Sequence, residues 1–191
     1  MISYDTLMKP LEKSLLGKIR KSMISHAKGD VLEIGFGTGV NMPFYNFDAI
    51  NSLNGLDLKI TTEQVNQFPS IKLHEGSASS LPFPDKSMDT ILATLVMCSV
   101  DDLIGSIKEI DRVLKDDGIY IFMEHVLPRN KVLKGLFKSI NKPWHAMSSC
   151  NLIRNTEEIF TQNGFKFIDI DQKAMGIFKY GIAVKEIPYA E

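Results

Sequence analysis

"VLEIGFGTG", residues 31–39, is a short apolar run that ends in three glycines. The apolar residues at 31–34 are typical of a buried strand. Glycines at positions 35, 37 and 39 are typical of a tight turn that a ligand can approach closely. Such a turn after a strand is characteristic of doubly wound α/β folds, whose ligands bind beyond the carboxyl ends of the parallel strands. The stretch therefore predicts a ligand site at the end of a strand.

The spacing of these glycines and the acid before them restrict the ligand. Dinucleotide-binding turns have the spacing G-x-G-x-x-G, whereas this chain has G-x-G-x-G followed by Val40. Glu33 would also repel a pyrophosphate, so a ligand with a ribose, a cationic end and no phosphate fits better, as S-adenosylmethionine (SAM) does. Asp57, 22 residues after Gly35, ends the next predicted strand, where a carboxylate can accept both ribose hydroxyls. Taken alone, the glycines also fit a structural turn and Asp57 a strand-end cap; their combination favours a cofactor site.

The rest of the chain alternates between predicted strands and helices. Helices are expected at 4–27, 61–67, 101–114 and 156–163, and further strands at 52–58, 71–75, 89–96, 119–125, 165–171 and 176–185. We also expect a short helix from the glycine turn toward Tyr45 and a turn at 115–118. The alternation predicts a single α/β domain over residues 1–191, with helices on both faces of a doubly wound, mostly parallel sheet and an antiparallel pair of last strands.

Composition places the chain among ordinary globular proteins. It has 191 residues, of which 44% are apolar and 24% charged. No segment has the roughly 18 uninterrupted apolar residues of a membrane span, and no signal-peptide core is evident, so a cytoplasmic location is expected. Cys98 and Cys150 form no close pair or metal-like pattern in the sequence, which predicts reduced thiols and no metal site. The sequence indicates no partner for His26 or His74, and both are expected at the surface.

Four segments together carry a resemblance to a known family. "VLEIGFGTG", "GLDL", "EGSASSLPFPDKSMD" and "EIDRVLKDDGIYIF" resemble the successive signatures of class I SAM-dependent methyltransferases, in the methyltransferase type 11 group, over residues 29–125. The resemblance implies a Rossmann-like sheet of seven strands with an antiparallel last strand, and SAM as the cofactor. A NAD-dependent oxidoreductase is improbable because of the glycine spacing and Glu33, whereas a non-catalytic SAM-binding protein stays an alternative.

The resemblance also gives roles to residues of the cofactor site. It implies that Glu33 lies at the ammonium group of SAM, Asp57 at the ribose, Leu58 and Ala78 beside the adenine, and Thr94 at the methionine end. Many relatives carry an aspartate near the adenine amine where this chain has a serine at position 77, whose hydroxyl can still form a hydrogen bond there. The candidate cofactor-binding residues are Glu33, Gly35, Phe36, Gly37, Thr38, Gly39, Asp57, Leu58, Ser77, Ala78, Thr94 and Leu95.

A narrower resemblance concerns the methyl acceptor. "TLVMCSV" (94–100), "FMEHV" (122–126) and "PWHAMSSCNLIR" (143–154) are similar to segments of the membrane-associated alkyl thiol S-methyltransferases and their bacterial relatives. This implies a small lipophilic acceptor, with a thiol favoured and a phospholipid amine or a quinone precursor as alternatives. His125 ends a predicted strand and is the candidate catalytic base, with simple packing as its alternative. Glu124 is expected on the opposite face of that strand.

Residues 128–155 form a predicted insertion with a basic amphipathic helix at 131–147. The stretch 129–154 holds six Lys and Arg residues and no acid. Its apolar face predicts a lid over the substrate pocket, and a peripheral membrane contact is the alternative. Trp144, His145 and Cys150 are the substrate-pocket candidates, with core packing as the other interpretation. Nucleic acid is not an expected partner, since the chain has a net charge of -1 and no nucleic-acid motif.

Overall fold

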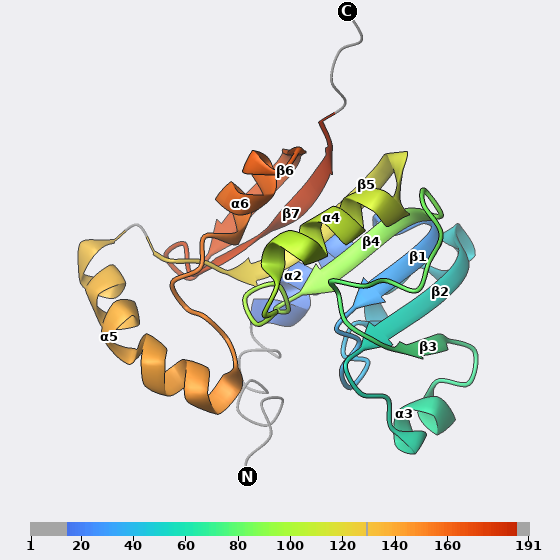
Figure 1. The fold of residues 1–191 in the computed structure, drawn as a ribbon, viewed down its shortest axis with the longest axis horizontal. Coiled ribbons are helices and arrows are strands. Elements are labelled where there is room, and N and C mark those ends of the chain that lie inside the picture. The colour runs from blue at the N-terminus through green and yellow to red at the C-terminus, as the bar shows by residue number, and fades with distance from the viewer. Residues whose placement is uncertain (1–14, 129, 187–191) are drawn as a thin grey trace, which may run out of the picture.

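The computed structural model describes residues 15–128 and 130–186. Within them the chain forms one seven-stranded sheet in the order β3-β2-β1-β4-β5-β7-β6 (Figure 1). The strands are β1 (Gly29–Ile34), β2 (Ile50–Asp57), β3 (Lys72–Glu75), β4 (Met88–Thr94), β5 (Leu114–His125), β6 (Phe165–Lys173) and β7 (Phe178–Lys185). The first five strands pair in parallel, and β7 pairs antiparallel with both β5 and β6. The predicted doubly wound sheet with its antiparallel last pair is therefore confirmed.

Helices pack on both faces of this sheet, as predicted. The α-helices are α2 (Gly17–Ile24), α3 (Thr62–Gln67), α4 (Leu103–Val113), α5 (Lys131–Ser148) and α6 (Thr156–Gln162). Figure 1 shows α4 and α6 on the near face of the sheet and α2 behind it. The part of the predicted first helix before residue 15 lies outside the described residues.

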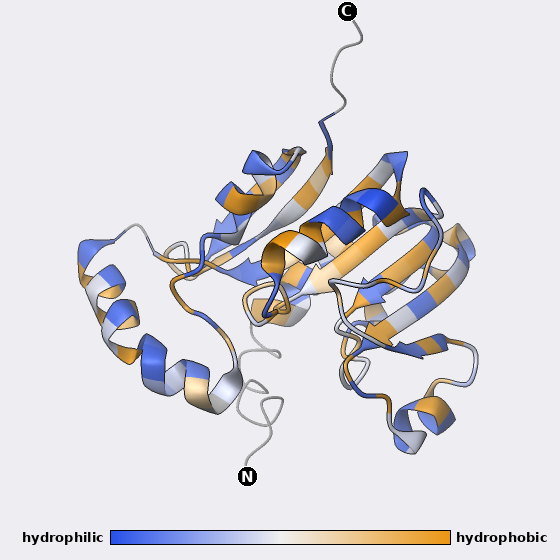
Figure 2. Ribbon diagram, viewed as in Figure 1, coloured by the Kyte–Doolittle hydropathy of each residue, from blue (hydrophilic) through white to orange (hydrophobic). Residues whose placement is uncertain are grey.

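Strand alternation divides the apolar side chains of β1 between two cores. Leu32 and Ile34 pack with residues of α4 and α6, whereas Val31 packs with residues of α2. Successive side chains of a strand point to opposite faces, so a central strand of a covered sheet is buried on both sides. β4 shows the same property: six of its seven residues are buried, and Figure 2 shows it as a mostly hydrophobic strand.

One local expectation was confirmed and one was wrong. The glycine turn leads into a short helix toward Tyr45, as expected, and this helix and the next are of the 3₁₀ type: Met42–Phe44 and Phe47–Ala49. Pro43 has no N–H to donate, which favours a short turn there. The predicted turn at 115–118 lies within β5, because Leu114 pairs with Met88 and the next pairing residue is Ile119. Residues 115–118 are therefore an irregularity in the strand, since they have no partners on β4.

The helix α5 departs most from the body of the domain. Figure 1 shows it projecting away from the sheet. Its apolar side chains are only partly covered: Val132 is 80% exposed, Leu136 53% and Ile140 37%. Figure 2 shows hydrophilic and hydrophobic residues along its length. No helix of the described segments is long and apolar enough to cross a membrane.

Candidate cofactor and acceptor site

A cavity of about 450 Å³ opens at the carboxyl ends of β1 to β4. This edge of the sheet includes the switch point between β1 and β4, where the strand order reverses and where doubly wound folds bind their ligands. Its volume lies in the range of sites for small molecules. Half of the twelve candidate cofactor residues line it: Gly35, Asp57, Leu58, Ser77, Ala78 and Leu95.

Asp57 is held in place by backbone N–H groups at the rim of the cavity. The N–H of Gly37 donates to its Oδ2 atom and the N–H of Leu58 donates to its Oδ1 atom, both at 2.7 Å. The carboxylate is half-buried and lines the cavity. Each oxygen keeps further capacity to accept, so the side chain is oriented to receive two hydroxyl donors. This geometry fits the ribose of SAM.

The three glycines of the turn have different physical requirements. All three have positive φ: 72° at Gly35, 54° at Gly37 and 73° at Gly39. A Cβ atom at Gly35 would lie 2.3 Å from a side-chain carbon of Val96, and one at Gly39 would lie 2.4 Å from the ring of Phe68. At Gly37 the nearest heavy atom would be 3.9 Å away. Packing thus explains the outer glycines, while the space beside Gly37 is open to a ligand.

The loop after β4 forms the other side of the cavity. Leu95 has a φ of 60°, a backbone conformation that residues other than glycine rarely adopt. Its N–H donates to the carbonyl of Met123 at 2.6 Å. Val96, Ser99 and Asp101 also line the cavity, and sequence reasoning missed all three. The available signal for these residues was their place after the end of a parallel strand, since the same kind of position had indicated Asp57 as a ligand-binding residue.

Glu33 lies in a buried network behind the glycine turn. Its Oε1 atom accepts from Asn41 Nδ2 and its Oε2 atom from the Tyr45 hydroxyl, both at 2.7 Å. Arg20 Nη1 donates to Asn41 Oδ1 at 2.5 Å and to Thr94 Oγ1 at 2.7 Å. Burial raises the pKa of Glu33 to about 7, and the contacts with Tyr45, Asn41 and Arg20 partly oppose this. Sequence reasoning missed Arg20, Asn41 and Tyr45, since no motif marks them.

Six of the candidate cofactor residues do not line the cavity in the described part of the chain. Glu33 and Thr94 belong to the network just described, and Phe36 is buried with its ring 5.3 Å from that of Phe68, edge to face. Gly37 lies at the rim through its bond to Asp57. The remaining two are Thr38 and Gly39. Cofactor contacts by these six residues stay predictions.

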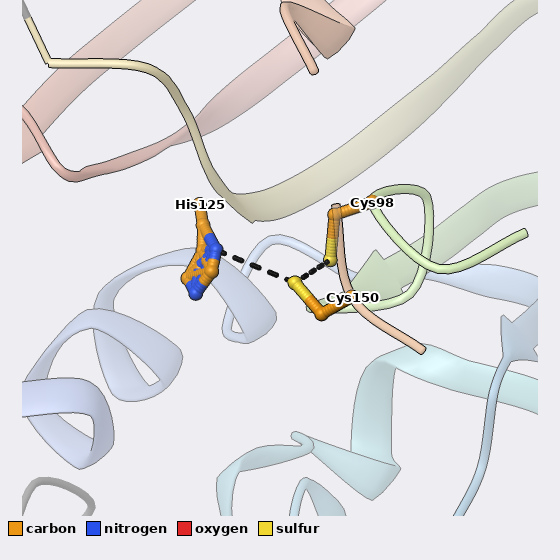
Figure 3. Close-up of side chains that lie close together, drawn as sticks. All are labelled: Cys98, His125 and Cys150. Carbon is orange, nitrogen blue, oxygen red and sulfur yellow. Dashed lines mark hydrogen bonds between the residues drawn. The ribbon is translucent and has the colours of Figure 1, made fainter. Parts of the chain in front are cut away.

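A second group of side chains gathers beside the cavity, at the ends of β4 and β5 (Figure 3). The Sγ atoms of Cys98 and Cys150 lie 3.1 Å apart, and Cys150 Sγ lies 3.7 Å from Nδ1 of His125. All three residues are at most 5% exposed. The expectation that the two cysteines form no close pair was therefore wrong: they are distant in sequence but adjacent in the fold.

In the group Cys98, His125 and Cys150, the hydrogen bond between the two sulfurs shifts the two thiol pKa values in opposite directions. The bond lowers the pKa of Cys150 to about 5, and the contacts with His125 and Trp144 act in the same direction. The same bond, with burial, raises the pKa of Cys98 well above its ordinary value. Cys150 is therefore the more acidic of the two thiols.

Glu124 holds the loop that carries Cys98. Its carboxylate accepts the N–H groups of Val96 at 3.0 Å, Met97 at 2.8 Å and Cys98 at 3.2 Å. Burial raises the pKa of Glu124 to about 7, and these backbone donors oppose the change. Sequence reasoning had ranked Glu124 below His125. The structure gives it a positioning role next to both groups of residues.

The other sequence-predicted residues take varied positions. Trp144 is half-buried and packs with Phe137 against Cys98 and Cys150, whereas His145 is exposed. No residue of α5 lines the 450 Å³ cavity among the described residues, so the lid stays a prediction. Of the two histidines expected at the surface, His26 is exposed, with Nδ1 3.2 Å from the carbonyl oxygen of Met23. His74 is half-buried instead: its Nε2 atom lies 3.2 Å from Asn54 Oδ1 and its ring contacts that of Phe83.

Comparisons with known proteins agree with this geometry. Residues 32–122 match the family model described as a methyltransferase domain. The methyltransferase YcgJ of Bacillus subtilis is 28% identical over 82% of this chain and 65% of its own length. The human thiol S-methyltransferase TMT1A is 26% identical over 86% of this chain and 71% of its own. A demethylmenaquinone methyltransferase of Chlorobaculum parvum is 30% identical over 63% of this chain and 51% of its own.

Solved structures give the same fold. The crystal structure of YcgJ matches with a TM-score of 0.62 at 20% identity, covering 88% of this chain and 94% of the other. A SAM-dependent methyltransferase of Mesorhizobium loti matches with a TM-score of 0.66 at 15% identity, covering 86% and 94%.

The sheet order, the glycine turn and the cavity at the switch point give this chain the Rossmann-like fold of the solved structures it matches. Residues 32–122 match the family described as a methyltransferase domain, and this match indicates SAM as the cofactor. The chain spans 65% of YcgJ and 51% of the demethylmenaquinone methyltransferase.

Proposed function

We propose that this protein transfers the methyl group of SAM to a small lipophilic thiol. The observation that carries the choice of acceptor is the extent of sequence similarity. The match to the thiol S-methyltransferase TMT1A covers 86% of this chain, whereas the match to the demethylmenaquinone methyltransferase covers 63%. The longer match takes in more of the chain beyond the cofactor-binding segments, which supports a thiol over a quinone precursor.

The residues of the cavity fit SAM. Asp57 has oxygens free to accept the ribose hydroxyls, and the open space beside Gly37 admits the cofactor next to the backbone. Leu58 and Ala78 offer an apolar surface for the adenine, and Ser77 a hydroxyl for its amine. When bound, SAM supplies an electrophilic methyl group on a sulfonium, a good leaving group.

The chemistry requires positioning more than proton transfer. In this reaction the acceptor sulfur attacks the methyl carbon in line with the carbon–sulfonium bond, and that bond breaks to leave the neutral product of SAM. Alignment of the two reactants accounts for up to about 7–11 kcal/mol of the barrier. A thiol with an ordinary pKa of about 8.5 is partly ionised near neutral pH, so it needs no dedicated base. His125 stays the candidate for such help, because it ends the strand next to β4.

The helix α5 has a surface suited to a lipophilic acceptor or a membrane interface. Val132 and Leu136 are exposed, and the lysines at 131, 134 and 138 are also exposed on the same helix. Basic helices with exposed apolar residues bind anionic interfaces, where lipophilic compounds concentrate. We propose that α5 contacts such an interface and does not form a permanently closed cover.

A methyl-transfer assay with matched acceptors tests the proposed function. The purified protein and SAM are incubated with alkyl and aryl thiols, with the alcohols and phenols of the same carbon skeletons, with a quinol, and with phosphatidylethanolamine vesicles. We expect a thioether and demethylated SAM in equal amounts from thiols alone, at a rate that rises with pH as the thiol ionises. Methylation of the quinol or the phospholipid without any thiol product would overturn the acceptor. SAM binding without product from any acceptor would favour the non-catalytic alternative.

A further inference from the structure

We propose that Cys98, His125 and Cys150 form a binding site for a thiophilic divalent cation of the zinc class. Their ligand atoms, two sulfurs and one imidazole nitrogen, all lie within 4.8 Å of one another. Three separate segments supply them: the loop after β4, the end of β5 and the segment after α5 (Figure 3). This site is separate from the SAM cavity and is needed neither to bind the cofactor nor to ionise a thiol.

The separations between the ligand atoms are close to those around a tetrahedral zinc ion. Zinc bonds of about 2.3 Å to sulfur and about 2.0–2.1 Å to nitrogen place two sulfurs about 3.8 Å apart and a sulfur and a nitrogen about 3.6 Å apart. The observed separations are 3.1 Å between the sulfurs and 3.7 Å from Cys150 Sγ to His125 Nδ1. A metal ion therefore requires the two sulfurs to move apart by less than about 1 Å. It also requires Cys98 Sγ to lie about 3.6 Å from the imidazole nitrogen, and the two atoms are already within 4.8 Å of each other.

The backbone around these ligands is fixed before any ion binds. Glu124 accepts N–H groups from three successive residues of the loop that carries Cys98. The N–H of Asn151, next to Cys150, donates to the carbonyl of Cys98 at 2.9 Å. Arg154 Nη1 donates to the carbonyls of Met97 and Val100, both at 2.8 Å. These bonds join the two cysteine-bearing segments, so little ordering accompanies the binding of an ion.

The surroundings favour a soft ion over a hard one. Leu152, Phe137 and Trp144 pack against the two cysteines and exclude water from the sulfurs. Two sulfurs and an imidazole prefer zinc and similar ions, whereas magnesium and calcium prefer oxygen ligands. Three protein ligands leave one position of a tetrahedral ion for water or another small ligand. His125 cannot act as a base while it binds a metal ion. The proposed thiol acceptor requires no base, so the two proposals are compatible.

Metal binding by the reduced full chain tests this inference without any methyl transfer. Zinc alone is titrated against a chromophoric chelator, and native mass spectrometry counts the ions retained. Cobalt is then used as a spectroscopic probe, because thiolate ligands give it an intense charge-transfer absorption. We expect one ion per chain and that absorption. All thiolate signal must come from this pair, because the chain has only two cysteines.

Matched variants connect the ion to these residues. His125→Asn, Cys98→Ser and Cys150→Ser should lower zinc affinity by more than the roughly 10- to 100-fold that loss of an outer-shell partner costs. His145→Asn, an exposed histidine on α5, should bind zinc as the parent does. If a cysteine variant does not fold, the cobalt spectrum of the parent chain decides. A reduced, folded parent chain that retains no zinc would overturn the inference, as would unchanged zinc affinity in His125→Asn.

Discussion

Asp57 offers the most direct perturbation of the cofactor site. Its carboxylate accepts two backbone N–H groups at 2.7 Å, and the residue lines the cavity. Hydrogen bonds to a charged group contribute about 1.5–3 kcal/mol each. Losing even one of the two bonds to the ribose hydroxyls in Asp57→Ala should therefore weaken SAM binding by at least about tenfold, since 1.4 kcal/mol corresponds to that factor, and losing both by about 100-fold or more. Asp57→Asn keeps the side-chain volume but loses the charge and one acceptor oxygen. Its SAM affinity should therefore lie between those of the parent chain and Asp57→Ala.

Isothermal calorimetry with SAM measures this loss, and thermal unfolding without SAM shows whether the fold is kept. The two N–H groups that Asp57 accepts lie in exposed contacts and can bind water instead, so we expect a small change in stability. Glu63→Gln is the matched control, because it removes one carboxylate charge from the exposed first turn of α3. Equal SAM affinity in the parent chain and a folded Asp57→Ala variant would refute the assignment of Asp57 to the ribose.

Three further predictions concern the glycine turn, the buried acid and α5. Gly37→Ala should still fold, at a cost of about 1–2 kcal/mol for alanine at positive φ, and lose SAM affinity, because its Cβ enters the open space. Gly35→Ala should lose more stability, since its Cβ would also lie 2.3 Å from a valine carbon. Calorimetry measures the SAM affinity of each variant and thermal unfolding measures its stability. Normal SAM binding by Gly37→Ala would contradict the prediction for the glycine turn. The pKa of Glu33 is raised to about 7 from its ordinary 4.5, so the folded form binds the extra proton and the free energy of unfolding should fall by at most about 3 kcal/mol as pH rises through that interval. Urea titrations at roughly pH 5 and pH 8 should show this loss of unfolding free energy in the parent and not in Glu33→Gln. The same change with pH in both proteins would contradict the prediction. Val132→Ser combined with Leu136→Ser should reduce sedimentation with anionic vesicles, and a parent chain that stays in solution would exclude the membrane contact.

The cofactor half of the site could be predicted because its determinants are local. The glycine turn and Asp57 each follow a strand directly, and parallel strands bring their carboxyl ends to one edge. Their positions in space follow from the strand pattern alone. The residues Arg20, Asn41 and Tyr45 could not be predicted, because a buried polar network depends on which helix crosses which strand end.

The acceptor half resisted prediction for the opposite reason. Cys98, His125 and Cys150 are 27 and 25 residues apart in the chain, and no sequence spacing indicates that their side chains meet. Glu124 was ranked low because alternation places it opposite His125. That reasoning assumed that only one face of the strand end has a role. β5 lies between β4 and β7 in the sheet, and its end is buried on both faces. Glu124 on one face and His125 on the other therefore both contact residues of the site.

The loop after β4 joins the two halves physically. Val96 and Ser99 line the SAM cavity, while Cys98 between them contacts Cys150. Leu95 begins this loop with a φ of 60°, a conformation that costs about 1–2 kcal/mol in an ordinary residue. Three N–H bonds to the carboxylate of Glu124 offset that cost, since each bond to a charged group contributes about 1.5–3 kcal/mol. Because the same loop supplies Val96 and Ser99 to the cavity and Cys98 to the contact with Cys150, a movement of the loop would change both groups of residues.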